Sequence, residues 1–151
     1  MRHAPTLALV ATMSACAGPQ VATADLPDTR TMMSRVEAIL VANHYPDAYG
    51  YARGPAPTVV MVPSLPDRHW GEYLVSAIKL SKEQPEACVP VTLAEEIAHD
   101  ATVRMGLISL AKGAPAWFVK EEFERIGALV AAHVASDGQW LPGCIMRHGV
   151  E

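Results

Sequence analysis

Apolar residues recur at helical spacing in three separate stretches of the chain. The first stretch predicts a helix over residues 28–43, which Asp28 can cap at its start. A second helix is predicted over residues 93–111. A third begins at Pro115, a residue that suits a first helical turn, and runs to about residue 135.

Two shorter stretches have the composition of β-strands. Residues 58–62 form a β-branched run between two prolines, which is typical of a strand. Residues 73–80 can form one or two more strands, and 77–81 is the better candidate within that region. The order helix, strand region, helix, helix predicts an α+β domain in which three main helices pack on a small antiparallel sheet.

The start of the chain has the pattern of an export signal. Arg2 and His3 form a short positive region, an apolar run follows, and residues 22–24 read Ala-Thr-Ala, the small-x-small pattern that a signal peptidase requires. We therefore expect residues 1–24 to be a signal peptide, residues 25–151 to be a single domain, and the protein to be periplasmic or secreted. The apolar run is too short to span a bilayer.

A lipoprotein signal is the alternative to this cleavage site. Residues 13–16 read Met-Ser-Ala-Cys, so Cys16 could carry a lipid anchor. Met is a poor first residue for such a motif. Soluble export is therefore the favoured prediction.

The net charge and the size of the expected domain limit the classes of protein to which it can belong. Removal of residues 1–24 leaves 127 residues, and the loss of Arg2 lowers Lys plus Arg from 12 to 11 while Asp plus Glu stays at 16, a net charge of −5. A mildly acidic domain has no basic surface for nucleic acid. Half of the residues are hydrophobic, which is enough for a substantial core.

Cleavage would leave two cysteines, Cys88 and Cys144. In an oxidising compartment, two cysteines most simply form one disulfide. The closed loop would hold about 57 residues, which is worth about 4 kcal/mol in the chain-entropy model. Metal binding by this pair is disfavoured because neither residue belongs to a C-x-x-C pair.

The segment that carries most chemistry reads Thr-Leu-Ala-Glu-Glu-Ile-Ala-His over residues 92–99. It differs by one residue from the zinc-binding pattern H-E-x-x-H, in which two histidines one helical turn apart bind the metal and the intervening Glu handles a proton. Here Glu95 and His99 are four residues apart and share one side of a helix, and Glu96 flanks that surface.

Helix capping is the competing interpretation of the same residues. Thr92 and Glu95 have the spacing of a capping box, in which each side chain accepts a hydrogen bond from the backbone of the other. Two carboxylates near a helix start also suit the helix dipole. Taken alone, the segment favours capping over a metal site.

The surrounding sequence resembles the small gluzincin-type metallopeptidase domains. In that family an edge strand, often Ile-x-Leu-Ser, precedes the H-E-x-x-H helix, and a second helix, often announced by Pro-x-Trp, supplies an acidic third ligand. This chain has Ile-Lys-Leu-Ser at 78–81, the altered motif at 95–99 and Pro-Ala-Trp at 115–117. The likeness covers residues 78–134 and implies a zincin-like fold.

The resemblance assigns a role to each matching position. Glu96 would be the general base and His99 a metal ligand, while Glu95 stands where the family has its first His ligand. For the third ligand we prefer Glu122 over Glu121 and Glu124. Glu122 shares an apolar stripe with Phe118, Ile126 and Leu129.

Glu122 also has an alternative role, as a surface Glu or as the partner of Arg104 or Arg125. Three other histidines are better explained as packed or hydrogen-bonded residues than as ligands: His44, His69 and His133. No Gly-x-Ser-x-Gly occurs to support a serine nucleophile.

Replacement of the first His by Glu95 changes the expected chemistry. An oxygen-rich ligand set shifts preference from zinc towards manganese, calcium or magnesium, and its extra negative charge makes a bound water less acidic. We therefore expect weak binding of zinc or another divalent metal, or none, with impaired or lost hydrolysis of a peptide substrate. The alternative is a non-catalytic exported domain that binds a peptide or protein partner.

Overall fold

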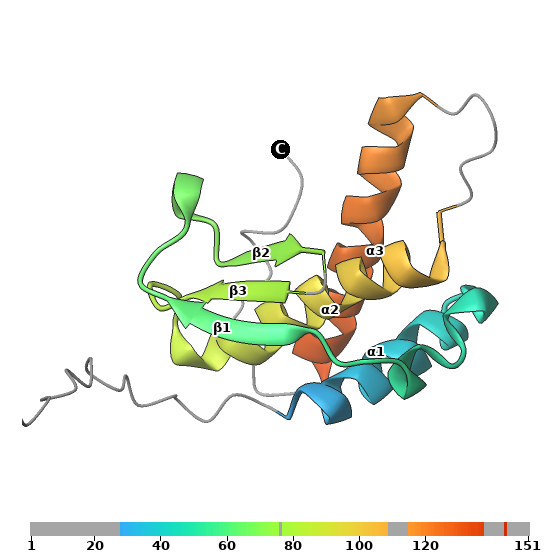
Figure 1. Cartoon of the computed structure of the whole chain (residues 1–151), viewed down its shortest axis with the longest axis horizontal. Helices are drawn as coiled ribbons and strands as arrows, with labels where there is room; N and C mark the ends of the chain where they lie inside the picture. Colours follow the sequence, from blue (N-terminus) through green and yellow to red (C-terminus); the bar gives the residue numbers. More distant parts are fainter. Residues whose placement is uncertain (1–27, 76, 109–114, 138–143, 145–151) are drawn as a thin grey trace, which may run out of the picture.

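The computed structural model describes residues 28–75, 77–108, 115–137 and 144. The expected signal peptide, with Cys16, lies outside these residues. The described part is an α+β domain (Figure 1). Its helices and strands are, in order, α1 (Thr29–Ala42), β1 (Thr58–Val62), β2 (Gly71–Leu74), β3 (Ala77–Ser81), α2 (Val89–Met105) and α3 (Ala116–Ser136).

The elements with strong local signals form where the sequence predicts them. Asp28 caps α1, because its carboxylate accepts hydrogen bonds from the backbone amides of Arg30 and Thr31. β1 has the predicted bounds. The region predicted to hold one or two strands forms two, the first of which begins at Gly71, two residues before the predicted region. α3 follows Pro115 and ends one residue beyond the predicted end.

The described sheet is mixed, so the prediction of an antiparallel sheet is wrong for one of its two strand pairs. Its order is β1-β3-β2, with β3 parallel to β1 and antiparallel to β2. Two residues join β2 to β3, which forces an antiparallel hairpin. Residues 63–70 carry the chain from β1 past β3 to β2, so β3 enters between them. Ile78–Ser81 therefore lies in the central strand and not at an edge.

α2 lies at the centre of the domain. It packs against β2 and β3 on one side and against α1 and α3 on others (Figure 1). Ile78 and Leu80 on β3 and Leu93 and Ile97 on α2 are fully buried in the shared core. Every residue of α2 from Val91 to Thr102 is buried, including its polar ones, so polar side chains on this helix need partners in the interior.

α2 begins four residues earlier than the sequence predicts. Its first residue is Val89, Pro90 lies in the first turn, and a short 3₁₀ turn over Glu86–Cys88 leads into it. Pro at this position has no amide to leave unpaired, which favours a helix start. The helix ends at Met105, where Gly106 adopts a left-handed conformation with φ of 59°.

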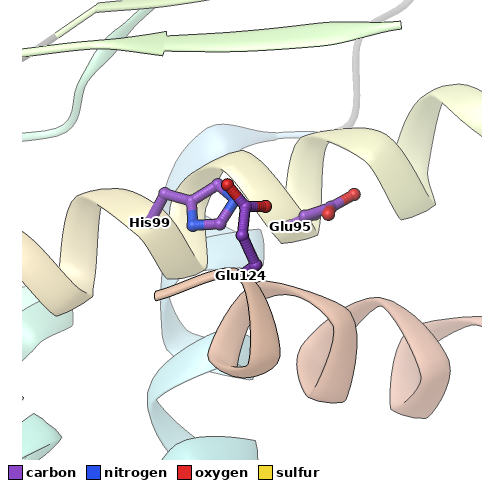
Figure 2. A group of neighbouring side chains, drawn as sticks. All are labelled: Glu95, His99 and Glu124. Atoms are coloured by element: carbon purple, nitrogen blue, oxygen red, sulfur yellow. The ribbon is translucent and has the colours of Figure 1, made fainter. Parts of the chain in front are cut away.

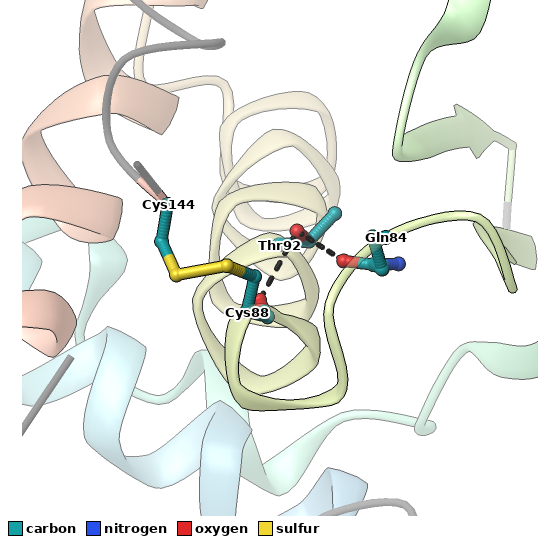
Figure 3. The surroundings of a disulfide bond; sticks show 4 residues. All are labelled: Gln84, Cys88, Thr92 and Cys144. Atoms are coloured by element: carbon teal, nitrogen blue, oxygen red, sulfur yellow. Dashed lines mark hydrogen bonds between the residues drawn. A yellow bond between two sulfur atoms is a disulfide. The ribbon is translucent and has the colours of Figure 1, made fainter. Parts of the chain in front are cut away.

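The predicted disulfide is present between Cys88 and Cys144 (Figure 3). It ties the start of α2 to the segment that follows α3, and both residues are buried. Beside it, the Thr92 hydroxyl donates to Gln84 Oε1 at 2.7 Å. Gln84 Nε2 donates in turn to the backbone carbonyls of Ser81 and Trp70. These hydrogen bonds hold the connection between β3 and α2 in place.

A second buried network lies further along α2. Asp100 is fully buried and accepts a hydrogen bond of 2.6 Å from the Tyr51 hydroxyl. Arg104 forms a 2.8 Å ion pair with the same carboxylate and also donates to the backbone carbonyl of Pro55. Because Asp100 follows His99, this network holds the rotation of α2 next to the site described below.

Within the described residues no helix is long and apolar enough to cross a membrane.

Candidate metal centre

The three motif residues on α2 lie in the protein interior. The exposed fractions of Glu95, Glu96 and His99 are 4%, 6% and 5%. Acidic side chains are seldom buried to this degree unless a partner or a metal stabilises them. Their burial follows from the position of α2 between the sheet and α3.

The capping interpretation of Glu95 is wrong. α2 already begins at Val89, so Thr92 is a helical residue, and its hydroxyl bonds Gln84 and the carbonyl of Cys88. Glu95 therefore lies well inside the helix, where no free amide remains for it to cap. Its place in the interior needs another explanation.

Glu95 and His99 meet a third potential ligand, Glu124 of α3. One ligand atom from each residue can be chosen so that all lie within 4.8 Å of one another. Figure 2 shows Glu95 and His99 on one helix and the Glu124 side chain extending to them from α3. Glu124 is exposed, whereas the other two are buried. Together they present two carboxylates and one imidazole.

Glu122, the preferred third ligand from the sequence, lies outside this group. Its two carboxylate oxygens accept hydrogen bonds of 2.9 and 2.8 Å from Arg125, which lower the pKa of Glu122. This is one of the alternatives that the sequence offered for it. Residues two apart on a helix point about 200° away from each other, so α3 can direct only one of Glu122 and Glu124 at α2.

Two glycines make room for the motif, and neither was singled out from the sequence. A Cβ at Gly127 on α3 would lie 2.6 Å from His99 Cε1 and 2.9 Å from its Nε2. A Cβ at Gly71 on β2 would lie 2.8 Å from Glu96 Cδ. Such distances are too short for carbon atoms in contact. The close approach of both elements to α2 therefore depends on the missing side chains.

An aromatic ring covers the face of the imidazole. Phe123, the neighbour of Glu124 on α3, stacks on His99 with ring centroids 4.0 Å apart and planes 12° from parallel. Stacked aromatic pairs of this kind are favourable beyond the area that they bury. α3 therefore contacts His99 through both Phe123 and Gly127.

The site is crowded with negative charge. Burial raises the pKa of Glu96 well above its usual range, and the nearby charges of Glu95, Glu124 and Glu72 raise it further. Glu96 therefore favours its protonated form more than an exposed Glu would. A divalent cation among these carboxylates would oppose that effect, because positive charge stabilises ionised carboxylates.

The other histidines considered as ligands do not join the group. His44, His69 and His133 are exposed, and the cluster of potential ligands consists of Glu95, His99 and Glu124. The donor set is therefore richer in oxygen than nitrogen.

Comparison with protein-family models, with curated proteins and with solved structures finds no match for this chain.

Proposed function

We propose that Glu95, His99 and Glu124 bind a divalent metal ion, and that the chain is an exported zincin-like domain with slow, metal-dependent peptide hydrolysis. The observation that carries this proposal is the convergence of the three potential ligands within 4.8 Å from two different helices. Local sequence alone brings Glu95 and His99 together. The addition of Glu124 requires the tertiary packing of α3 on α2.

Electrostatics support the same proposal. Glu95 and Glu96 are buried side by side, and Glu124 lies close enough to raise the pKa of Glu96. Concentrating carboxylates in a site of low dielectric is unfavourable unless protons or cations neutralise them. A divalent ion would supply two positive charges at the point where the ligand atoms converge.

The donor set favours a hard cation. Carboxylate oxygens suit manganese, magnesium and calcium, whereas imidazole suits zinc. With two carboxylates and one imidazole, we expect the advantage of zinc over manganese to be smaller than at a site with two histidines. Weak zinc binding distinguishes this arrangement from a site with two histidines.

In the proposed reaction Glu96 acts as the general base, the role that the resemblance to gluzincin-type domains implies for it. When bound, a divalent metal acidifies a coordinated water and polarises a carbonyl. Glu96 follows Glu95 on α2, packs against Gly71 of β2, and lies near enough to Glu95 and Glu124 for their charges to raise its pKa. The negative ligands reduce the acidifying effect of the metal, so hydrolysis should be slow.

The variant E96Q tests this role. It removes the base but keeps the shape of the side chain, so we expect manganese-dependent cleavage of an unfolded protein substrate to fall to background while manganese affinity changes by less than about tenfold. Cleavage is followed by the appearance of new amino termini. If the natural sequence binds manganese but shows no cleavage above E96Q, the hydrolytic part of the proposal is contradicted.

Export is supported by the disulfide between Cys88 and Cys144. Disulfides persist in oxidising compartments and are rare in the cytosol. The intact mass of the protein recovered from the periplasm or the medium should correspond to a chain that begins at Asp25. A mass that includes residues 1–24, or a lipid on Cys16, would contradict cleavage at this site.

A non-catalytic interaction domain is the second candidate. Glu95, Glu96 and His99 are almost fully buried, which leaves Glu124 as the exposed member of the group. Near the start of α3, Trp117 is 66% exposed and its neighbour Phe118 is also exposed, as in surfaces that contact partners. Cation binding without cleavage would favour this candidate, with the metal in a structural role.

A further inference from the structure

We propose that Phe123 is a positioning residue, whose ring fixes the plane of the His99 imidazole and thereby sets the affinity of the cation site. This inference rests on the proposed metal site and deepens it. It concerns a residue that neither supplies a ligand atom nor follows from the motif. Phe123 acts through His99 and has no direct role in binding.

The need for such a residue follows from the geometry of imidazole. A ring nitrogen directs its lone pair in the plane of the ring, so rotation about the last side-chain bond moves the lone pair away from a metal. That torsion has a broad energy profile in histidine. The side chain of His99 alone therefore does not fix the direction of its nitrogens, and neighbouring groups must do so.

Phe123 supplies this constraint from the face of the ring. Its ring lies nearly parallel to the imidazole, at a centroid distance of 4.0 Å and an angle of 12°. A rotation of His99 about its last bond would turn an edge of the imidazole into the aromatic face. The stack therefore opposes the rotation that would misdirect the nitrogens.

Gly127 supplies a second constraint at the edge of the same ring. It follows Phe123 by four residues, so both lie on one side of α3. The backbone at Gly127 approaches His99 so closely that an added Cβ would lie 2.6 Å from Cε1. Glu124 belongs to the same turn and reaches the same ring. One turn of α3 thus provides the stacking ring of Phe123, the third ligand Glu124, and the space at Gly127 for the edge of the imidazole.

The variant F123L tests the proposal because Leu keeps an apolar side chain but has no flat face. We expect manganese to bind F123L about tenfold more weakly than the natural sequence, because mutation of a residue that orients a metal ligand commonly lowers metal affinity by that amount. F123Y retains the ring and should bind within about twofold of the natural sequence. F118L is the matched control, because Phe118 lies on the same helix, is exposed and should leave binding unchanged.

Binding is measured from the electron paramagnetic resonance signal of free manganese. The orientation of the His99 ring is followed in the metal-free proteins by the proton NMR signal that connects His99 Cε1–H to the Gly127 α-protons, which are neighbours in this structure. We expect this His99 signal in the natural sequence and in F123Y, and its averaging in F123L, where the ring can rotate. If F123L is too unstable to purify, F123M serves with the same expectation.

The outcomes separate this inference from the proposed function. If the natural sequence does not bind manganese, the metal site itself is refuted. If it binds and F123L binds equally well with an unchanged His99 signal, the metal site stands and the positioning role of Phe123 is overturned. A tenfold loss in F118L as well would also overturn it, because the effect would then not depend on the stack.

Discussion

The variant E95H is expected to bind zinc at least about tenfold more tightly than the natural sequence, a gain of about 1.4 kcal/mol. It restores two histidines one helical turn apart, the pair that binds zinc in H-E-x-x-H helices. Imidazole suits zinc better than a carboxylate does, and the change removes one negative charge from a crowded site. The expected gain is specific to zinc and should be smaller for manganese.

The fold should accept this change. The Asp100 network with Tyr51 and Arg104 holds the rotation of α2, so residue 95 keeps its direction towards α3. Gly127 lies against Glu95 Cγ, where a Cβ would be 3.1 Å away, and leaves room beside the side chain. The Asp100 network does not involve the side chain at position 95.

Zinc affinity is measured by competition with a chromophoric chelator. E121H is a suitable control, because Glu121 is exposed on α3 and lies outside the cluster, so that variant adds a histidine without altering the site. The double variant E95H/H99A should return to weak binding. Equal zinc affinity for E95H and E121H would show that α2 does not present a zinc site and that the likeness to gluzincin-type domains is accidental.

Elements governed by local signals could be predicted from the sequence. α1 needs only a cap at Asp28 and one apolar face, and it forms within one residue of the prediction. The β-branched run between prolines is a strand with the predicted bounds. The disulfide followed from the number of cysteines left after removal of a signal peptide. None of these features depends on distant contacts.

Features governed by contacts between distant segments could not be predicted in this way. The parallel pairing of β1 with β3 depends on the path of residues 63–70. The role of Thr92 depends on tertiary structure, because its hydroxyl bonds Gln84 and not a free helix end. Thr92 and Glu95 have the spacing of a capping box, but the helix already extends past them to Val89.

The same distinction applies to the candidate site, where part of the ligand set follows from local sequence and part from the packing of two helices. The spacing of Glu95 and His99 is a property of one helix, and the structure places both in one cluster. The choice between Glu122 and Glu124 depends on how α3 is rotated against α2. Gly127 was the available signal, since glycine is unfavourable inside a helix and its presence there suggests a packing reason. It follows Glu124 by three residues and so marks the helix face that Glu124 shares.

The second large expected effect is a difference in manganese affinity between the variants E124Q and E122Q. Both variants replace one carboxylate by an amide of the same shape on the same helix, two residues apart. E124Q removes a proposed ligand, so manganese affinity should fall by at least about tenfold, since even groups that only orient ligands contribute that much. E122Q breaks the ion pair with Arg125 at the surface, which should leave manganese affinity within about twofold.

Equilibrium dialysis of manganese against the natural sequence, E124Q and E122Q tests the central claim most directly. We predict about one bound ion per chain for the natural sequence and for E122Q, and little or none for E124Q at the same free concentration. Absence of binding to the natural sequence, or equal binding to E124Q and E122Q, would contradict a metal site formed by Glu95, His99 and Glu124.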